Sequence, residues 1–515
     1  MIAQVVPILR LRRDTSWWSY RIPSSLACQP GSLVVVPFRG RDCLGVVWSV
    51  DEKDEKASSS VSQVLCHKPL VRAPQRQLIE WLSDYGLCSL STALYIWLPT
   101  GLRELSLGRA ARRLLAEYEA ESVTTDPERQ HAIIVPSLRP HQSLQLQHRL
   151  GDKFAELFDG NESEELERWF AIARGSTSVA MGREKALFAP WANLGKITLV
   201  DPEDISYYHE QLPYLNLVDA TQQLTEATGS DLEIRSGLPE QAALILWQAE
   251  QSESDPAFNM FEIVDLSREA LLNDPLVGSI KACLAESKKV VVLYNAHDRT
   301  ALITRDGKRE KVVQPGIETV SKRLAFLLGS DSLPDGVILG TRQILNAPLE
   351  NVGLTIVLSL DPLLSHASFA NTLNGIGDLG RLARYNVPCL VQTHQPGHPL
   401  VQALGSGHLE QYLLDEIAIQ KATTMPPFGQ QIVCSLPDNE GAADAASKTH
   451  TELAKLVASP WQLSHPFPSP WRKRPHVHIL LHAPDRNTRL PVLLRKELAA
   501  LPRPWKVQRN PWYLL

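Results

Sequence analysis

Several features that often reveal a protein's chemistry are missing from this sequence. Its seven cysteines include no Cys-x-x-Cys pair, so their spacing indicates neither a zinc ribbon nor a disulfide framework, and we expect reduced, mostly buried thiols. No Gly-x-x-x-x-Gly-Lys-Ser/Thr loop is present to hold nucleotide phosphates. No apolar run approaches the roughly 20 residues of a membrane span, and no long apolar core follows a basic start. We therefore expect a cytoplasmic protein without a membrane partner.

An excess of positive charge is also missing. The chain has 52 Lys and Arg against 57 Asp and Glu, which gives a net charge of −5. Binding along a nucleic acid depends on clustered cations, so any DNA contact must be local. With 515 residues, of which 44% are hydrophobic, the chain is long enough for roughly three or four globular domains.

One apolar run is followed closely by carboxylates. Residues 197–200 predict a buried strand, and Asp201, Glu203 and Asp204 come directly after it. In an α/β sheet such residues lie at the carboxyl edge, where ligands bind and where a nucleotide-hydrolysing enzyme keeps its magnesium carboxylate. A strand that ends in an acidic surface loop gives the same pattern, so both interpretations stay open here.

The surrounding segment resembles motif II of the PriA family of primosomal replication-restart helicases. The resemblance implies that Asp201 stands for the family's magnesium-binding Asp. The next family residue is the Glu that activates water, but Pro202 occupies its position and has no carboxylate. The positions that match the family pattern around this strand are Gly182, 186–188, Pro190, 193–195 and Asp201.

Three further family motifs are altered. Residues 374–381 resemble motif VI, in which two arginines serve nucleotide chemistry; Asp378 replaces the first and Arg381 keeps the second. A carboxylate facing a γ-phosphate would repel it. Residues 231–240 keep little of motif III, and the phosphate loop is missing. We expect no intact catalytic set, with Asp201, Glu203 and Arg381 as remnants, no ATP as cofactor, and enzymatic activity left open but not favoured.

The family's zinc-binding insertion is also reduced. It would begin at residues 301–310, where Thr304 lies near the position of the first cysteine and Gly307 near that of the second. Without thiolates at these positions nothing would hold zinc tetrahedrally, so we expect zinc binding to be lost.

The N-terminal residues predict a small β domain. Residues 33–38 and 44–50 are β-rich runs joined by a short loop, which is typical of a hairpin. Residues 15–50 resemble the PriA 3′-DNA-binding domain, although Ser19 replaces an Asp that helps to hold a 3′ end. Base stacking on an exposed aromatic contributes about 1 to 3 kcal/mol per base, although a Trp beside a Tyr is more often part of a core or an interface. The DNA-binding residues predicted here are Trp18, Tyr20, Arg39, Gly40 and Arg41.

A second basic segment lies near the C-terminus. Trp471, Arg472, Lys473 and Arg474 place three adjacent cations beside an aromatic ring, and they are the best local candidate for binding phosphate. A solvated charged loop is an equal alternative. The segment belongs to an α+β pattern, with a strand expected at 477–481 and a helix at 490–501.

The resemblance and the residue patterns together predict a multidomain α/β protein. We expect a 3′-DNA-binding β domain (1–68), a helical linker region without a winged helix (69–130), two degenerate RecA-like helicase lobes (131–255 and 256–395, the second without its zinc insertion) and a C-terminal α+β domain (396–515). Within the linker, 74–98 predicts two helices broken near Gly86, and 102–121 predicts one linking helix.

The resemblance implies a function as well. We expect an ATP-independent pseudohelicase that binds branched or forked DNA in replication restart and primosome assembly, associated with the nucleoid. Single-stranded-DNA-binding protein and primosome or helicase-loading proteins would be its partners. Two alternatives stay open: an active ATP-dependent 3′–5′ DNA helicase whose site is divergent or completed by a partner, and a protein-interaction scaffold that keeps the fold without DNA contacts.

Overall fold

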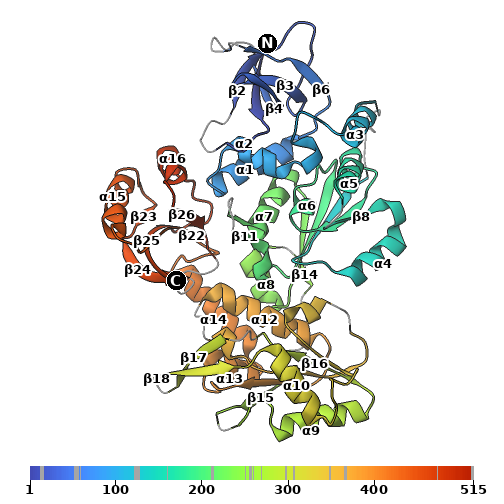
Figure 1. Cartoon of the computed structure of the whole chain (residues 1–515), viewed down its shortest axis with the longest axis vertical. Coiled ribbons are helices and arrows are strands. Elements are labelled where there is room, and N and C mark those ends of the chain that lie inside the picture. Colours follow the sequence, from blue (N-terminus) through green and yellow to red (C-terminus); the bar gives the residue numbers. More distant parts are fainter. Residues whose placement is uncertain are drawn as a thin grey trace.

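The computed structural model shows an elongated, multidomain α/β protein (Figure 1). An N-terminal β domain lies at one end, a second parallel-sheet lobe lies at the other, and the C-terminal domain packs at the side. The structure describes residues 1–11, 17–51, 57, 59–120, 128–158, 161–209, 214–249, 251–253, 258, 260–267, 269–295, 299–305, 308–346, 349–364, 368–471 and 474–511. No helix within these residues is both long and apolar enough to span a bilayer.

The N-terminal domain is a six-stranded sheet in the order β5-β2-β1-β4-β3-β6. The predicted hairpin is confirmed, but its turn is tighter than expected: Phe38 pairs with Arg41, which leaves only Arg39 and Gly40 in the turn. Both turn residues have positive φ, at 50° and 79°, as a two-residue hairpin turn requires. The strands are β1 (Ile2–Pro7), β2 (Trp18–Arg21), β3 (Leu33–Phe38), β4 (Arg41–Asp51), β5 (Ser59–Ser60) and β6 (Gln63–Cys66).

Helices connect this sheet to the first lobe. The expected pair is confirmed as α1 (Ala73–Tyr85) and α2 (Leu90–Trp97), with Gly86 at the end of α1. The Arg-rich stretch forms one helix, α3, but this helix spans only Arg109–Ala120 and begins later than the predicted range 102–121. A single hydrophobic cluster runs from one face of the N-terminal sheet through these helices into the first lobe, so the three parts share a core.

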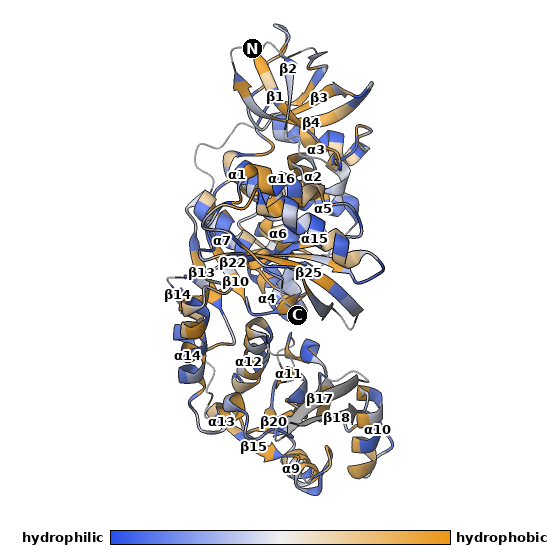
Figure 2. Ribbon diagram, turned by 90° about the vertical axis from the view of Figure 1, so that its left-hand side faces the viewer, coloured by the Kyte–Doolittle hydropathy of each residue, from blue (hydrophilic) through white to orange (hydrophobic). Residues whose placement is uncertain are grey.

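The first lobe is a parallel six-stranded sheet in the order β14-β13-β10-β7-β9-β8. The predicted central strand is confirmed as β10, and hydrophobic residues gather in the strands of the sheets (Figure 2). A short pair, β11 (Tyr208–His209) and β12 (Leu215–Asn216), follows β10. The other elements are β7 (Gln130–Ile134), β8 (Phe154–Leu157), β9 (Val179–Gly182), β10 (Leu194–Val200), β13 (Asp231–Arg235), β14 (Gln251–Glu253), α4 (Pro140–Leu150), α5 (Glu162–Arg174), α6 (Glu184–Leu187), α7 (Leu217–Thr228) and α8 (Glu240–Trp247).

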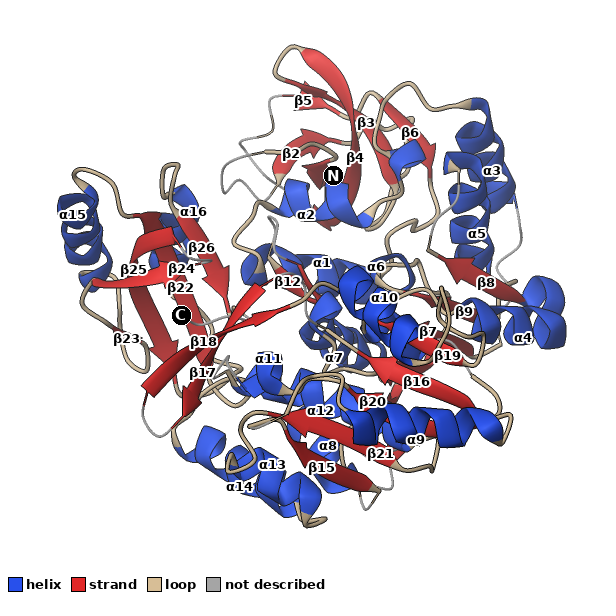
Figure 3. Ribbon diagram, turned by 60° about the horizontal axis from the view of Figure 1, so that its bottom comes forward, coloured by secondary structure: helices blue, strands red, loops and turns tan. Residues whose placement is uncertain are grey.

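The second lobe is a parallel five-stranded sheet in the order β15-β21-β20-β16-β19. Helices α9 and α10 pack on one face, while α12, α13 and α14 pack on the other (Figure 3). Helices α13 and α14, which the sequence assigned to the C-terminal domain, thus contribute to the core of this lobe. The elements are β15 (Phe261–Asp265), β16 (Lys289–Leu293), β19 (Val337–Gly340), β20 (Val352–Val357), β21 (Cys389–Thr393), α9 (Asp274–Ala285), α10 (Ile317–Leu327), α11 (Asp361–Leu364), α12 (Phe369–Ala383), α13 (Pro399–Gly405) and α14 (Leu409–Ala422).

An antiparallel hairpin stands where the family's zinc insertion would begin. Its strands are β17 (Arg299–Arg305) and β18 (Lys308–Gln314). The C-terminal domain follows as an antiparallel sheet in which β22 and β25 form the longest pair. Its elements are β22 (Gln430–Pro437), β23 (Gln462–Leu463), β24 (Phe467–Trp471), β25 (Arg474–Ala483), β26 (Lys506–Arg509), α15 (Ala442–Ala454) and α16 (Val492–Ala500), which include the expected strand and helix.

Candidate functional site

The acidic residues after β10 lie at the carboxyl edge of the first lobe's sheet, as predicted. Asp201, Glu203 and Asp204 follow the end of the strand at Val200, and all three are buried. The alternative of an acidic surface loop is therefore wrong. Asp201 has a φ of 48°, in the left-handed region that Asp tolerates better than most residues. This turn directs the chain toward the second lobe, which supplies most of the partners described next.

Asp201 faces arginines from both lobes. Its Oδ2 accepts a hydrogen bond from Arg139 Nη2 and lies 3.6 Å from Arg381 Nε. Its Oδ1 lies 4.0 Å from Arg384 Nη2 and accepts no hydrogen bond from the described residues. Burial acts to raise the pKa of Asp201, but the surrounding guanidinium groups outweigh it and hold that pKa below its usual value. Asp201 is therefore an ionised carboxylate neutralised by the protein's own cations.

Asp204 uses both carboxylate oxygens on protein partners. Its Oδ2 lies 3.2 Å from Nη2 of Arg381 and 3.2 Å from Nη2 of Arg342, both in the second lobe. Its Oδ1 accepts hydrogen bonds from the backbone N and Oγ of Ser206 at 2.9 and 2.8 Å. Asp378, at the position of the first motif VI arginine, lies 3.2 Å from Arg342 and 3.5 Å from Arg381. The cluster is thus an alternation of opposite charges across the lobe boundary.

Glu203 is engaged by the loop after β13. Its Oε2 accepts a hydrogen bond from Ser236 Oγ at 2.9 Å, and its Oε1 accepts one from the backbone N of Gly237 at 2.9 Å. Burial and the neighbouring charge of Asp201 raise the pKa of Glu203 to about 7. Its two oxygens therefore anchor this loop against the acidic segment.

Glycines bring the two lobes together at backbone distance. A Cβ on Gly380 of α12 would collide with the carbonyl group of Gly237, and one on Gly377 would collide with the side chain of Glu203. Arg384 also donates a hydrogen bond to the carbonyl oxygen of Ser236 at 2.8 Å. The loop after β13 and helix α12 are consequently in direct contact beside the carboxylates.

The residues present do not fit the magnesium nucleotide that the family resemblance implies. Magnesium requires open oxygen ligands in octahedral geometry, whereas Asp204 has no free oxygen and Asp201 faces three guanidinium groups. A nucleotide would also have to displace Arg381, whose side chain is 4% exposed. Among the described residues, no group of three or more His, Cys, Asp or Glu side chains is placed to hold a metal ion.

The tip of the N-terminal domain combines aromatic and basic side chains. Trp18 is half-buried and packs edge-on against Phe38, with ring centroids 4.9 Å apart. Arg39 lies over the Phe38 ring at 5.3 Å, and Arg39, Gly40 and Arg41 are all exposed in the hairpin turn. The sequence did not single out Trp17, which is 50% exposed and precedes this strand. The structure therefore brings Trp18 and the turn residues together as one patch.

Tyr20 does not belong to that exposed patch, which corrects the sequence interpretation. Its side chain is 3% exposed and packs in the core of the N-terminal sheet. Its hydroxyl donates a hydrogen bond to the Pro37 carbonyl oxygen at 3.0 Å, and burial raises the pKa of Tyr20 to about 12. Its ring face is covered by the sheet's own side chains, so it offers no stacking surface.

The second predicted phosphate-binding segment lies at a strand hairpin far from the first. Trp471 ends β24 and pairs with Arg474, which begins β25. Arg472 and Lys473 lie outside the described residues. Trp471 and Arg474 thus stand at the ends of two paired strands, which is compatible with the sequence prediction but adds no contact to it.

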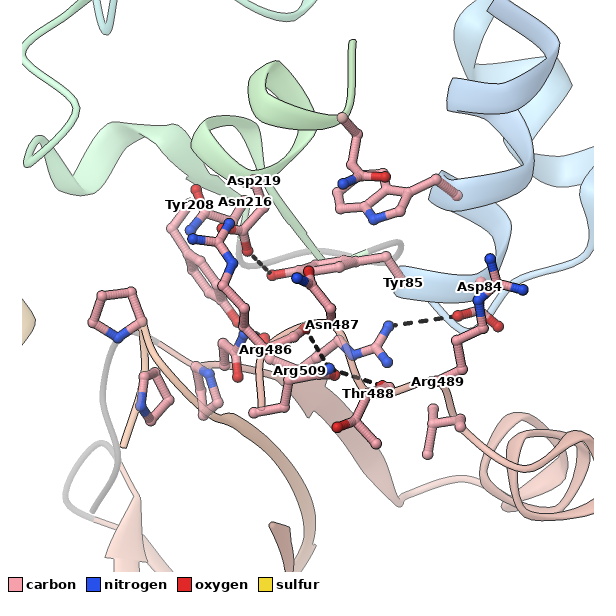
Figure 4. A pocket seen from close by; sticks show the side chains of 18 of the residues that line it. Asp84, Tyr85, Tyr208, Asn216, Asp219, Arg486, Asn487, Thr488, Arg489 and Arg509 are labelled. Carbon is pink, nitrogen blue, oxygen red and sulfur yellow. Dashed lines mark hydrogen bonds and ion pairs between the residues drawn. The ribbon is translucent and has the colours of Figure 1, made fainter. Parts of the chain in front are cut away.

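A cavity of about 780 Å³ lies where α1, the first lobe, α12 of the second lobe and the C-terminal domain meet (Figure 4). Tyr85 donates a hydrogen bond to Asp219 at 2.8 Å, and the Arg509 guanidinium lies 5.2 Å from the centre of the Tyr85 ring. Asp84 lies 3.5 Å from Arg495 and 3.8 Å from Arg509. The cavity is lined by both guanidinium and carboxylate groups, and two of its arginines, Arg495 and Arg509, are paired with Asp84. The sequence did not predict this cavity because its walls come from four distant parts of the chain. Its arginines are Arg486, Arg489, Arg495 and Arg509.

Comparison with known proteins gives matches along the chain. Residues 8–99, which run from the N-terminal sheet through α2, match the family model described as 3′DNA-binding domain (3′BD) of PriA. "Replication restart protein PriA" of Rickettsia felis is 23% identical over 335 residues, which cover 54% of this chain and 51% of that protein. The Bacillus subtilis protein of the same description is 19% identical over 424 residues, covering 65% and 51%. The chain spans about half the length of these relatives.

Among solved structures, yeast Dbp5 L327V bound to RNA and ADP BeF3 matches 61% of this chain and 86% of its own, with 11% identity and a TM-score of 0.32. A score this low supports no argument about function. The family model and the sheet order instead define the class of protein: a multidomain α/β protein that begins with a 3′-DNA-binding-type β domain. The curated relatives extend the similarity to PriA proteins beyond residues 8–99, at 19 to 23% identity.

Proposed function

We propose that this protein binds branched or forked DNA during replication restart and does so without hydrolysing ATP. Support for DNA binding comes from the 3′-DNA-binding domain match and from the exposed turn residues beside Trp18. The net charge of −5 requires that binding depend on such local patches. The two parallel-sheet lobes are, in this proposal, degenerate RecA-like helicase lobes that position the DNA-binding domains.

One observation carries the ATP-independent part of the proposal. Arg381, which stands at the second arginine position of motif VI, forms ion pairs with Asp204 and lies near Asp201 instead of being available to a γ-phosphate. Pro202 removes the water-activating carboxylate beside it, and no phosphate loop is present. Each of these changes removes a different part of phosphoryl-transfer chemistry.

The finer expectations belong to the same proposal. Single-stranded-DNA-binding protein and primosome or helicase-loading proteins would be its partners, at the nucleoid in the cytoplasm. Zinc would not be a structural component, because the hairpin β17–β18 replaces the family's insertion and the seven cysteines are scattered free thiols. Elemental analysis that found about one or two tightly held zinc ions per chain would contradict this last point.

A binding titration against forked, duplex and single-stranded DNA tests the proposal. We expect tighter binding to the fork than to duplex of the same length, since two separated patches can then engage different arms. Equal and weak binding to all three substrates would favour the alternative of a protein-interaction scaffold. Fork unwinding that requires ATP would favour the alternative of an active 3′–5′ helicase.

A further inference from the structure

The boundary between the lobes is ionic at its centre. Arg381 and Arg342 of the second lobe both reach Asp204 of the first lobe at 3.2 Å. The side chains of Arg381 and Asp204 are 4% and 8% exposed, so bulk salt screens their attraction only weakly. Removing one partner of such a pair leaves an uncompensated buried charge. The cluster therefore stabilises the relative position of the two lobes in which these ion pairs form.

Two further contacts reinforce the same boundary. The backbone of Gly380 lies directly against that of Gly237, so no layer of solvent or ligand separates the two segments. Ala242 and Leu246 of helix α8, and Leu238 just before that helix, lie in the hydrophobic cluster of the second lobe. Ionic, backbone and apolar contacts thus all hold one relative position of the lobes.

We propose that the arginine–carboxylate cluster is a latch that keeps the two lobes closed without any nucleotide. The latch consists of Arg342 and Arg381 on one side and Asp201 and Asp204 on the other, with Asp378 bridging the two arginines. It rests on the proposed function, because it assigns to the protein's own guanidinium groups the charge balance that a bound nucleotide would otherwise bring to the lobe boundary. It fixes the spacing between the domains attached to the two lobes.

Hydrogen exchange of the full chain, read by mass spectrometry, tests the latch. In Arg381→Gln, exchange in the segments 231–247 and 369–383 is expected to accelerate on the order of 100-fold, as for a buried ion pair whose removal lets the boundary open. The strands β16 and β20 in the centre of the second lobe should keep their protection. The matched control is Lys322→Ala, which removes an exposed ion pair with Glu318 on α10 and should change neither segment.

A milder variant keeps the test decisive. Arg342 is 22% exposed at the edge of the cluster, so Arg342→Ala should fold even where Arg381→Gln does not, and it should accelerate exchange in the same two segments. Folded Arg342→Ala with protection equal to the unaltered protein would overturn the latch. Phosphate release after magnesium and ATP are added to the unaltered protein separates the two proposals. Release would refute the ATP-independent part of the proposed function, whereas no release together with unaffected variants would refute the latch alone.

Discussion

Arg381 donates a hydrogen bond to Asp204 at 3.2 Å across the lobe boundary, although 177 positions separate the two residues. Asp204 belongs to the acidic segment after β10, and Arg381 lies on α12 in the segment that resembles motif VI. The resemblance of these two segments to motifs II and VI implies nucleotide chemistry for both. Here they face each other directly, and their charges are balanced within the protein.

The first prediction concerns hydrolysis. The purified protein should show no DNA-stimulated ATPase activity, because Pro202 removes the water-activating group and Arg381 is engaged by carboxylates. A phosphate-release assay with forked DNA measures this. Turnover that follows the protein through purification and disappears in Asp201→Asn would contradict the prediction, whereas turnover that persists in that variant indicates a contaminant.

Sequence reasoning was most successful where one local pattern decides the structure. The apolar run before Asp201 had to be a buried strand, and the β-rich runs around Arg39 and Gly40 had to form a hairpin. It was least successful for pairings between distant segments. Nothing in the spacing of Arg342 or Arg381 indicates that their partners lie in the first lobe, because tertiary packing alone brings those segments together.

The mistaken interpretation of Tyr20 has a related cause. Trp18 and Tyr20 are two positions apart on β2, so they point to the same face of the sheet. Composition cannot tell which of the two lies nearer the middle of that face. In the structure Tyr20 lies over the sheet core, whereas Trp18 lies toward the rim beside Phe38. The sequence did not predict the cavity near Tyr85 either, because distant segments of the chain form it, as they form the arginine–carboxylate cluster.

The second prediction separates these two aromatic residues. Trp18→Ala should weaken fork binding by about 1 to 3 kcal/mol if one base stacks on the ring, with little change in salt dependence. Tyr20→Phe should leave fork affinity unchanged and lower the free energy of unfolding by about 0.5 to 1.5 kcal/mol, because its hydrogen bond to the Pro37 carbonyl oxygen is removed. Titration and denaturant unfolding of both variants measure this, and an unchanged affinity in folded Trp18→Ala would be inconsistent with it.

The third prediction concerns the basic segment of the C-terminal domain. Replacing Arg472, Lys473 and Arg474 together by alanine should flatten the dependence of log affinity on log salt by about 0.7 to 0.9 for each phosphate that the segment no longer binds. The matched control replaces Lys322 and Arg323, two cations on α10 outside the predicted DNA-binding patches, and should leave the slope unchanged. Equal slopes in the triple variant and in the unaltered protein would show that the segment is an ordinary solvated loop.

The fourth prediction concerns acid stability. His131 on β7 is largely buried, and burial followed by the charge of Lys196 lowers the pKa of His131 from 6.5 to about 4. Between pH 4 and 6.5 the imidazole of His131 is therefore protonated less in the folded state than in the unfolded state. The contribution of His131 to the free energy of unfolding is fully present above pH 6.5 and is lost as the pH falls toward 4. The loss attributable to His131 should reach about 2 to 3 kcal/mol near pH 4.

Denaturant unfolding of the unaltered protein and of His131→Gln across this pH range isolates that contribution. Glutamine can keep a hydrogen bond to the Thr198 hydroxyl, which lies 2.8 Å from His131 Nε2, but it does not titrate. The stability difference between the two proteins should therefore shrink or reverse as the pH falls. Parallel pH profiles for the two proteins would show that His131 contributes nothing to acid sensitivity.

Fork affinity measured with and without magnesium and ATP tests the central claim most directly. If the lobe boundary stays closed, the proposed DNA-binding patches on the N-terminal and C-terminal domains keep one fixed arrangement, so nucleotide should not change fork affinity. We predict that the dissociation constants with and without magnesium and ATP agree within about 2-fold. A tenfold change would correspond to about 1.4 kcal/mol of binding free energy. A change of about tenfold or more on adding magnesium and ATP, together with its loss in a folded Asp201→Asn variant, would contradict the account.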